Sequence, residues 1–164
     1  ALGREWQMGT LQLDFQQPKN FNLKYSAQDG TEKIPVVIHR VVYGSMERFI
    51  GILIEHYACA FPLWLAPVQV VLLPIADRHN EFAQKAAVEL RNAGIRAEAD
   101  MRSERLQAKI RDATLQKVPF MGIIGDKEVE TRTISARTRT GEDLGSLKVS
   151  SFLEQLQEQI DKKT

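Results

Sequence analysis

The residues with the clearest chemical potential lie where an expected strand passes into an expected helix. The segment Lys33–Val42 is rich in the β-branched residues that favour strands, and apolar residues then recur at helical spacing through 46–57. Ser45 can cap this helix, because a serine hydroxyl accepts a hydrogen bond from an unpaired amide of the first turn. Arg48 falls in that turn, where free amides and the helix dipole favour anions such as phosphate. The alternative for Arg48 is an ordinary surface arginine paired with an acidic neighbour.

His39, near the end of the expected strand, is the residue type that most often binds transition metals. A lone histidine at a strand end is, however, more often a satisfied structural side chain. The single cysteine, Cys59, allows neither an internal disulfide nor a cysteine-based zinc site, and we expect it to contribute to packing. His56 and His79 have no partners at ligand spacing and are expected at the surface.

Around these residues, the first sixty positions predict an antiparallel meander. Apolar and polar residues alternate through 10–15, the period of a strand with one apolar face. We expect a second strand at 21–25, a turn at 28–30 that uses Asp and Gly, and a third strand at 33–42. The proline-containing segment 61–66 is interpreted as a linker between a first domain at 1–60 and a second domain at 67–164.

The second domain alternates expected strands with expected helices. The continuous apolar run Val68–Leu73 is typical of a strand buried on both faces. Further strands are expected at 95–99 and 119–124, helices at 80–93, 104–116 and 149–160, and two strands or one bent strand at 128–139. Lys109 falls on the polar side of its helix. The pattern predicts an α/β domain in three layers with a mixed, mainly parallel sheet.

Composition limits the classes of function. The chain has 164 residues, of which 43% are hydrophobic and 26% charged, as in a globular protein. Its net charge is only +1, so bulk charge gives little support for nucleic-acid binding, and any RNA contact must come from local placement of side chains. No apolar run approaches the roughly 18 residues of a membrane span. We expect a cytoplasmic protein.

Three segments of the first domain, taken in order, resemble a known family. ALGREWQMGTLQLDF, PVVIHR and GSMERFIGILIEH are similar to the end of the catalytic domain of bacterial-type threonyl-tRNA synthetases, and GSMERF looks like motif 3 of class II aminoacyl-tRNA synthetases. The pattern G-x-x-x-R alone is common by chance, so the resemblance depends on the order of the segments and on the α/β domain behind them. It covers essentially the whole chain and includes WLAPVQV, NAGIRAEAD and VPFMGIIGDKEVE.

The resemblance implies part of a site for ATP and threonine. Arg48 would be the catalytic arginine of motif 3, lying against adenine and reaching phosphate, and Ser45 would lie beside the nucleotide. Gln7 and Thr10 would contact the adenosine, and Gln12 the threonine pocket. The alternative for these three residues is the plain polar face of a half-buried strand.

The resemblance also implies a zinc ion that is held by one cysteine and two histidines, with His39 as the second histidine. That zinc would bind the amino group and hydroxyl of threonine, and a site built around the hydroxyl rejects valine. Because only one of the three ligands is present, we do not expect the chain to bind zinc tightly. ATP with Mg is the implied co-substrate.

In the second domain, Glu128 and Arg137 match positions that contact anticodon bases in the family. An arginine can present two donors to a base edge, and a carboxylate can accept from an amino or imino group. The alternative is a cross-strand Glu–Arg pair, worth only ~0.2–1 kcal/mol. Lys127, Arg132 and Arg139 are weaker candidates for phosphate contacts.

The sequence therefore predicts part of a synthetase that makes threonyl adenylate and transfers threonine to its tRNA. The full enzyme is expected to be a homodimer, and this chain alone is expected to be inactive. One alternative is a non-catalytic tRNA- or protein-binding module with an anticodon-type domain. Another is a related class II synthetase for a different amino acid, against which His39, nine residues before Arg48, favours threonine.

Overall fold

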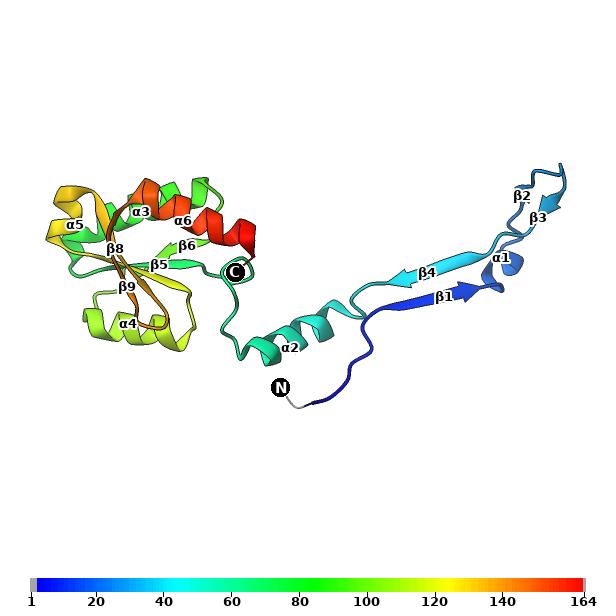
Figure 1. Ribbon diagram of the computed structural model, residues 1–164, viewed down its shortest axis with the longest axis horizontal. Helices are drawn as coiled ribbons and strands as arrows, with labels where there is room; N and C mark the ends of the chain where they lie inside the picture. The colour runs from blue at the N-terminus through cyan, green and yellow to red at the C-terminus, as the bar shows by residue number, and fades with distance from the viewer. Residues whose placement is uncertain (1–2, 164) are drawn as a thin grey trace. The chain divides into compact units, whose positions relative to one another are not determined.

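The computed structural model describes residues 3–163, and the chain divides into two compact units, Ala1–His56 and Tyr57–Thr164 (Figure 1). Residues 1, 2 and 164, which are included in the predicted domains, lie outside the described residues. Leu63 and Ala66, in the segment expected to be a linker, are buried. Among the described helices, none is both long and apolar enough to cross a membrane.

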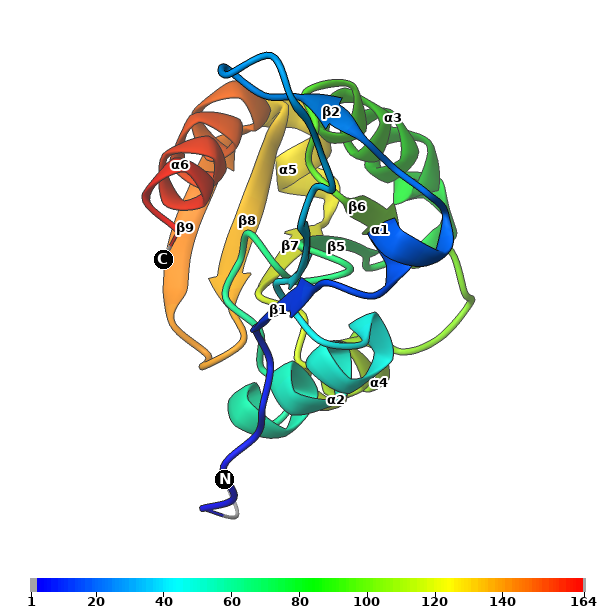
Figure 2. The same cartoon turned by 90° about the vertical axis from the view of Figure 1, so that its right-hand side faces the viewer.

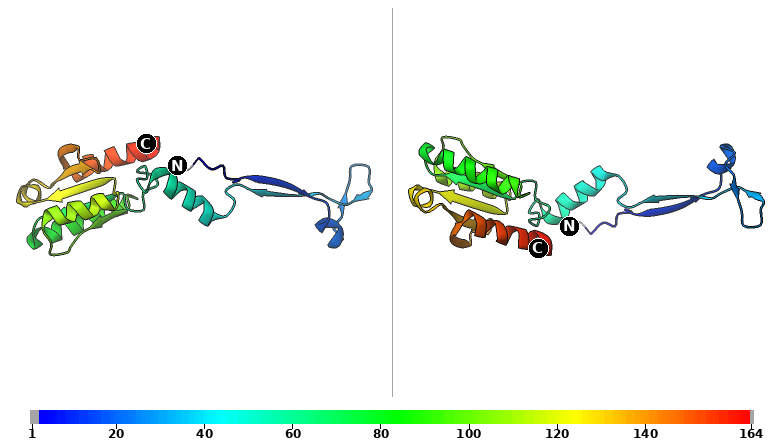
Figure 3. Two further views of the ribbon diagram at one scale, coloured as in Figure 1. Left: turned by 90° about the horizontal axis from the view of Figure 1, so that it is seen from below. Right: turned by 90° about the horizontal axis from the view of Figure 1, so that it is seen from above.

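The first unit contains a long antiparallel ribbon. Strand β1 (Thr10–Asp14) pairs with β4 (Val37–Val41), and beyond them β2 (Tyr25–Ser26) pairs with β3 (Glu32–Lys33) (Figure 3). The pairing is antiparallel as expected, but the strands do not form the expected meander, because β1 pairs with β4 and not with the next strand. The strand expected at 33–42 is divided into β3 and β4, and the one expected at 21–25 reaches only Tyr25. The short helix α1 (Gln17–Asn20), which the pattern did not indicate, follows β1. Asp14 begins it by accepting hydrogen bonds from the amides of Gln16 and Gln17.

This first unit has almost no core. Among its described residues only Pro18 is buried, and Leu11, Leu13 and Ile38 are 66%, 56% and 60% exposed. Helix α2 (Met46–Tyr57) likewise contains no buried residue. Two-stranded ribbons are at best marginally stable alone, so the apolar side chains on this unit are suited to contact with further protein.

The second unit contains a five-stranded mixed sheet in the order β6-β5-β7-β8-β9 (Figure 2). The strands are β5 (Val70–Pro74), β6 (Ala97–Ala99), β7 (Phe120–Ile124), β8 (Thr133–Thr138) and β9 (Asp143–Lys148). Strand β5 is parallel to both β6 and β7, whereas β8 is antiparallel to β7 and to β9. The predicted α/β fold class with a mixed sheet is confirmed, although the antiparallel part is as large as the parallel part.

Helices form the outer layers. Helices α3 (Asn80–Asn92) and α6 (Val149–Lys162) lie on one side of the sheet and α4 (Leu106–Leu115) on the other (Figure 1). The larger core lies under α3 and α6 and includes Leu72, Leu90, Ile134, Phe152 and Leu156. A smaller cluster of Leu73, Ala113 and Met121 lies under α4.

The prediction for 128–139 was wrong over its first part. A short helix, α5 (Asp126–Thr131), precedes β8. It is closed at its start by the Glu128 carboxylate, whose Oε2 accepts a hydrogen bond from the Gly125 amide at 3.0 Å. It ends at Arg132, which adopts a left-handed conformation with φ 53°. Glu at the third helical position is typical of such a cap. The helix itself has only six residues, which is too few for apolar residues to recur at helical spacing.

Cys59 was expected to be packed, but it is exposed. It follows helix α2 in a turn where both Ala58 and Cys59 have positive φ, 48° and 63°.

Candidate nucleotide site and candidate nucleic-acid interface

The start of α2 has the geometry that the sequence predicts for a capped helix. The Ser45 Oγ accepts a hydrogen bond from the Arg48 amide at 3.2 Å. Gly44 precedes it with φ +68°, and a Cβ there would lie 3.4 Å from the carbonyl oxygen of Met8. Gly44 therefore permits the left-handed turn, while the segment that carries Gln7 and Met8 lies at ordinary contact distance from it.

The Arg48 guanidinium lies over an aromatic ring. Its Cζ is 6.0 Å from the ring centroid of Trp6, within the range of a cation–π contact. Trp6 is itself 45% exposed. The side chain thus already lies against a flat, electron-rich surface, which is compatible with the stacking role expected for it.

Three of the predicted site residues share one face of the ribbon. In the register of β1 and β4, Gln12 lies directly opposite His39 and Thr10 opposite Val41. Residues directly opposite, and those two positions along a strand, point to the same side. Thr10, Gln12 and His39 therefore face one way, and Gln12 and His39 line a shallow hollow together with Asp14.

His39 makes a contact that the sequence analysis did not anticipate. Its Nε2 lies 3.0 Å from Asp14 Oδ2. The amide of Gln17, followed by the His39 ring, lowers the pKa of Asp14 below its usual value. Within residues 3–163 no group of three histidine, cysteine or acidic side chains is close enough to hold a metal ion. The donors of this chain alone do not fit a zinc site, and His39 is one ligand at most.

Glu128 and Arg137 lie on different elements but border the same side of the sheet. On β8, Ile134 and Ala136 are buried in the larger core, so Ser135 and Arg137 point to the opposite face. Ser135 is paired with Ser146 on β9, and Ser146 Oγ lies 3.5 Å from Glu128 Oε1. A row of polar side chains thus runs from Glu128 on α5 to Arg137.

Glu128 caps helix α5 with one of its two carboxylate oxygens. While Oε2 caps α5, Oε1 makes only the 3.5 Å contact with Ser146, which is at the outer limit for a hydrogen bond. The cross-strand Glu–Arg pair, the alternative for these two residues, does not form, because Glu128 is helical. One carboxylate oxygen therefore retains acceptor capacity toward the open face.

The Arg137 guanidinium makes few polar contacts. Its nearest acidic contact is Nη2 to Asp143 Oδ2 at 4.0 Å, and its buried Nε has no hydrogen-bond partner among the described residues. Buried donors are nearly always satisfied, so an unpaired one calls for an explanation. Arg139, a weaker candidate for phosphate contact, instead donates from Nη1 to the Phe61 carbonyl at 2.6 Å.

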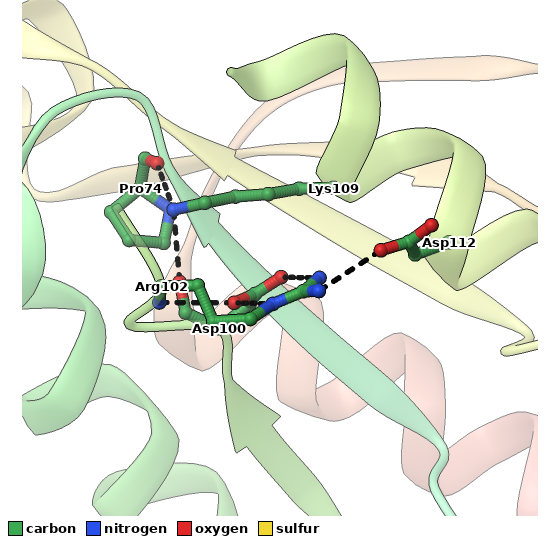
Figure 4. A network of polar contacts seen from close by, with 5 residues as sticks. All are labelled: Pro74, Asp100, Arg102, Lys109 and Asp112. Carbon is green, nitrogen blue, oxygen red and sulfur yellow. Dashed lines mark hydrogen bonds and ion pairs between the residues drawn. The ribbon is translucent and has the colours of Figure 1, made fainter. Parts of the chain in front are cut away.

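Lys109, expected on the polar side of its helix, is buried with an exposed fraction of 3%. Its Nζ donates to the carbonyls of Pro74 and Asp100, both at 3.0 Å, and so joins the ends of β5 and β6 (Figure 4). Arg102 bridges Asp100 and Asp112 beside it, and this guanidinium is the main reason that the pKa of Asp100 is lowered.

His79, expected at the surface, is also buried, with an exposed fraction of 2%. Its Nε2 lies 2.9 Å from Asp126 Oδ1, and Arg78 binds both oxygens of the same carboxylate. Arg78 first, and His79 second, hold the pKa of Asp126 well below its usual value. No local pattern predicts the burial of Lys109 and His79, because hydrogen-bond partners such as Pro74 and Asp126 are distant in sequence.

Comparison with known proteins agrees with this arrangement. A family model described as the tRNA synthetase class II core domain (G, H, P, S and T) matches residues 1–57, and one described as the anticodon binding domain matches residues 69–159. The chain therefore belongs to the class II aminoacyl-tRNA synthetases that carry an anticodon-binding domain.

Within that class, the relatives are threonine–tRNA ligases, and the resemblance drawn from the sequence is confirmed. The protein of Alkalilimnicola ehrlichii is 54% identical over 98% of this chain, and that of Desulforamulus reducens is 52% identical over all of it. The chain spans only 25% and 26% of the lengths of these relatives.

Solved structures give the same result. The structure described as the RNA binding domain of threonyl-tRNA synthetase from Cryptosporidium parvum Iowa II has a TM-score of 0.85 and 32% identity, and it covers 97% of this chain and 40% of that chain. A prolyl-tRNA synthetase from Cryptosporidium parvum has a TM-score of 0.67 at 20% identity over 89% of this chain and 31% of its own. The latter likeness shows the fold alone.

Proposed function

We propose that the second unit binds the anticodon of threonine tRNA and that the protein containing this chain is a threonine–tRNA ligase. The observation that carries the proposal is the open polar face of β8 and β9 in a chain of the anticodon-binding family. A partly exposed arginine, whose Nη2 lies as far as 4.0 Å from Asp143 Oδ2, and a glutamate with a spare oxygen border that face. Unpaired anticodon bases expose donors and acceptors that such side chains can bind.

In this proposal, residues 1–60 complete a catalytic sheet, 61–66 connect the parts, and 67–164 form the anticodon-binding domain. The exposed Leu11, Leu13 and Ile38 would be covered by the remainder of the synthetase, because apolar ribbons gain stability from such burial.

Arg48 would act on ATP, with Gln7, Thr10 and Ser45 around the nucleotide and Gln12 near threonine. The arginine would stabilise the negative charge that develops on the phosphate oxygens in the transition state. The reaction would need no covalent enzyme nucleophile. Mg would accompany ATP. His39 would supply one of three zinc ligands, the other two coming from outside this chain. The complete enzyme would be a cytoplasmic homodimer.

Binding of purified tRNAs to the 164-residue chain tests the proposal. We expect a preference for threonine tRNA that Arg137→Ala weakens at least about fivefold, since a base contact by arginine is worth roughly 1–3 kcal/mol. Arg91→Ala, at an exposed position at the end of α3, is the matched control and should have little effect. Equal affinity of the unaltered chain for all tRNAs would show the proposal to be wrong and would favour a general binding module.

A further inference from the structure

The buried imidazole of His79 connects two loops at one edge of the sheet. The backbone amide of Ala76 donates to its Nδ1 at 3.2 Å. An amide N–H can only donate, so Nδ1 is the acceptor and the ring proton lies on Nε2. That Nε2–H then donates to Asp126 Oδ1 at 2.9 Å. Both ring nitrogens are thus satisfied, and the ring is fixed in a single orientation.

The two loops follow adjacent parallel strands. Residues Ala76–His79 come after β5, and Asp126 opens helix α5 after β7. Because β5 and β7 are parallel neighbours, both loops lie at the carboxyl edge of the sheet, where α/β proteins bind their ligands. Arg78 holds the same carboxylate from outside, with Nε to Oδ1 at 2.8 Å and Nη2 to Oδ2 at 2.6 Å.

Helix α5 needs such external restraint. It has only six residues, none of them buried, and isolated helices of this length are unstable. Its start lies close against the loop after β5, since a Cβ on Gly125 would come within 2.9 Å of Ile75 Cδ1. Glu128 lies two residues beyond Asp126 on this helix, so the position of its free oxygen depends on what holds α5.

We propose that His79 is a positioning residue for RNA recognition: by binding Asp126 it fixes α5 so that Glu128 faces the open side of β8 and β9. The inference rests on the proposed anticodon binding and extends it to a residue that does not itself touch RNA. A histidine needed only to fill space would not need its two nitrogens matched to groups on two separate loops.

A pair of substitutions separates the two hydrogen bonds of the ring. In His79→Gln the side-chain amide nitrogen can replace Nε2 as the donor to Asp126. In His79→Asn the shorter side chain can replace only Nδ1 as the acceptor for Ala76. Asp126→Ala, at a side chain that is 64% exposed, removes the acceptor of the His79 Nε2–H without altering the core. Lys85→Met, at an exposed pair on α3, serves as control.

Each variant is measured for affinity to threonine tRNA with its own anticodon and to the same tRNA with one anticodon base changed, with thermal unfolding as a check on folding. We expect His79→Asn and Asp126→Ala to lose about three- to tenfold in affinity for the cognate anticodon, as for the loss of one ordinary hydrogen bond. Both should also reduce the discrimination between the two tRNAs. His79→Gln should remain close to the unaltered chain, as should Lys85→Met.

Two results would overturn the inference. One is unchanged affinity and discrimination in Asp126→Ala. The other is an equal loss in His79→Gln and His79→Asn, which would mean that packing alone matters. If the unaltered chain shows no anticodon preference, the proposed function itself fails. If it discriminates and Glu128→Gln abolishes this discrimination while Asp126→Ala does not, only the positioning role of His79 fails.

Discussion

The two oxygens of the Glu128 carboxylate make different contacts. Oε2 closes the first turn of α5 by accepting from the Gly125 amide, and Oε1 faces Ser146 at 3.5 Å. Replacement by alanine would remove both and confuse a folding defect with a binding defect. A substitution that keeps the cap is therefore needed to isolate the contact with a base.

Glu128→Gln is that substitution. Glutamine also closes capping boxes, so its oxygen can stay on the Gly125 amide while a donor NH₂ group replaces Oε1. We expect tRNA affinity to fall by roughly fivefold or more, about 1 kcal/mol, because a base donor would meet another donor. The free energy of unfolding should change by less than about 0.5 kcal/mol.

Filter binding and urea unfolding measure the two quantities, with Glu130→Gln, an exposed neighbour on the same helix, as control. An unchanged affinity for threonine tRNA would exclude Glu128 from base recognition.

At the scale of elements, one buried ammonium joins two parallel strands. Lys109 extends from α4 to the carbonyls of Pro74 and Asp100, which lie at the ends of β5 and β6. Strand β6 has only three residues and lies at the edge of the sheet. The Lys109 contact and the hydrogen bond from the Asp100 amide to the Leu72 carbonyl both hold its carboxyl end.

We expect Lys109→Met to lower the free energy of unfolding by about 1–3 kcal/mol, because methionine fills the stem but leaves buried carbonyls without a donor. Urea denaturation measures the change. Lys85→Met, at a lysine whose side chain is 73% exposed, should change stability by less than about 0.5 kcal/mol. If Lys109→Met also lowered the free energy of unfolding by less than about 0.5 kcal/mol, other contacts would hold the strand ends.

The link between the β5 loop and α5 should depend on pH. Hydrogen bonds from Arg78, and then from His79, keep the pKa of Asp126 below its ordinary value of 3.8. A lowered folded-state pKa means that the unfolded chain binds the proton more readily. The stabilisation is therefore fully present above pH 3.8 and is lost as the pH falls below that value toward the folded-state pKa.

Urea unfolding of the unaltered chain and of Asp126→Asn at pH 7, 4 and 3 checks this dependence. The difference in stability between the two proteins should be constant from pH 7 to about pH 4–5 and should shrink below that. A difference that stays the same at pH 3 would mean that the Asp126 carboxylate has no preferential partner in the folded state.

At the scale of the whole molecule, the two units differ in how completely they are built. The second unit has a core of fully buried side chains such as Leu72 and Phe152, whereas the first has one buried proline among its described residues. The first unit also contributes His39 without enough neighbouring donors to complete a metal site. In the proposed function, the first unit would therefore act together with groups from outside this chain.

We expect the isolated chain to show no threonine-dependent pyrophosphate–ATP exchange. Arg48 and Ser45 alone cannot orient the α-phosphate and the amino acid together, and such orientation supplies most of the rate. The assay compares the chain with a complete threonine–tRNA ligase under the same conditions. Exchange at a rate near that of the complete enzyme would contradict this prediction.

The sequence by itself determined whatever depends on near neighbours. The alternation through 10–15 predicted β1, and the helical repeat through 46–57 predicted α2. Ser45, three residues before Arg48, predicted the cap that the hydroxyl makes. The continuous apolar run Val68–Leu73 predicted β5. The family followed from the order of several such segments. Each of these features is decided within one or two turns or along a single strand.

Only the tertiary structure decided the burial of Lys109 and His79, and which face of β8 is left open. Lys109 binds Pro74, 35 positions away, and His79 binds Asp126, 47 positions away. A polar side chain is buried when distant groups satisfy its hydrogen bonds, and no local period reports such partners. The segment at 126–131 is a short helix whose first turn the Glu128 side chain caps, and a count of apolar positions does not detect such a cap.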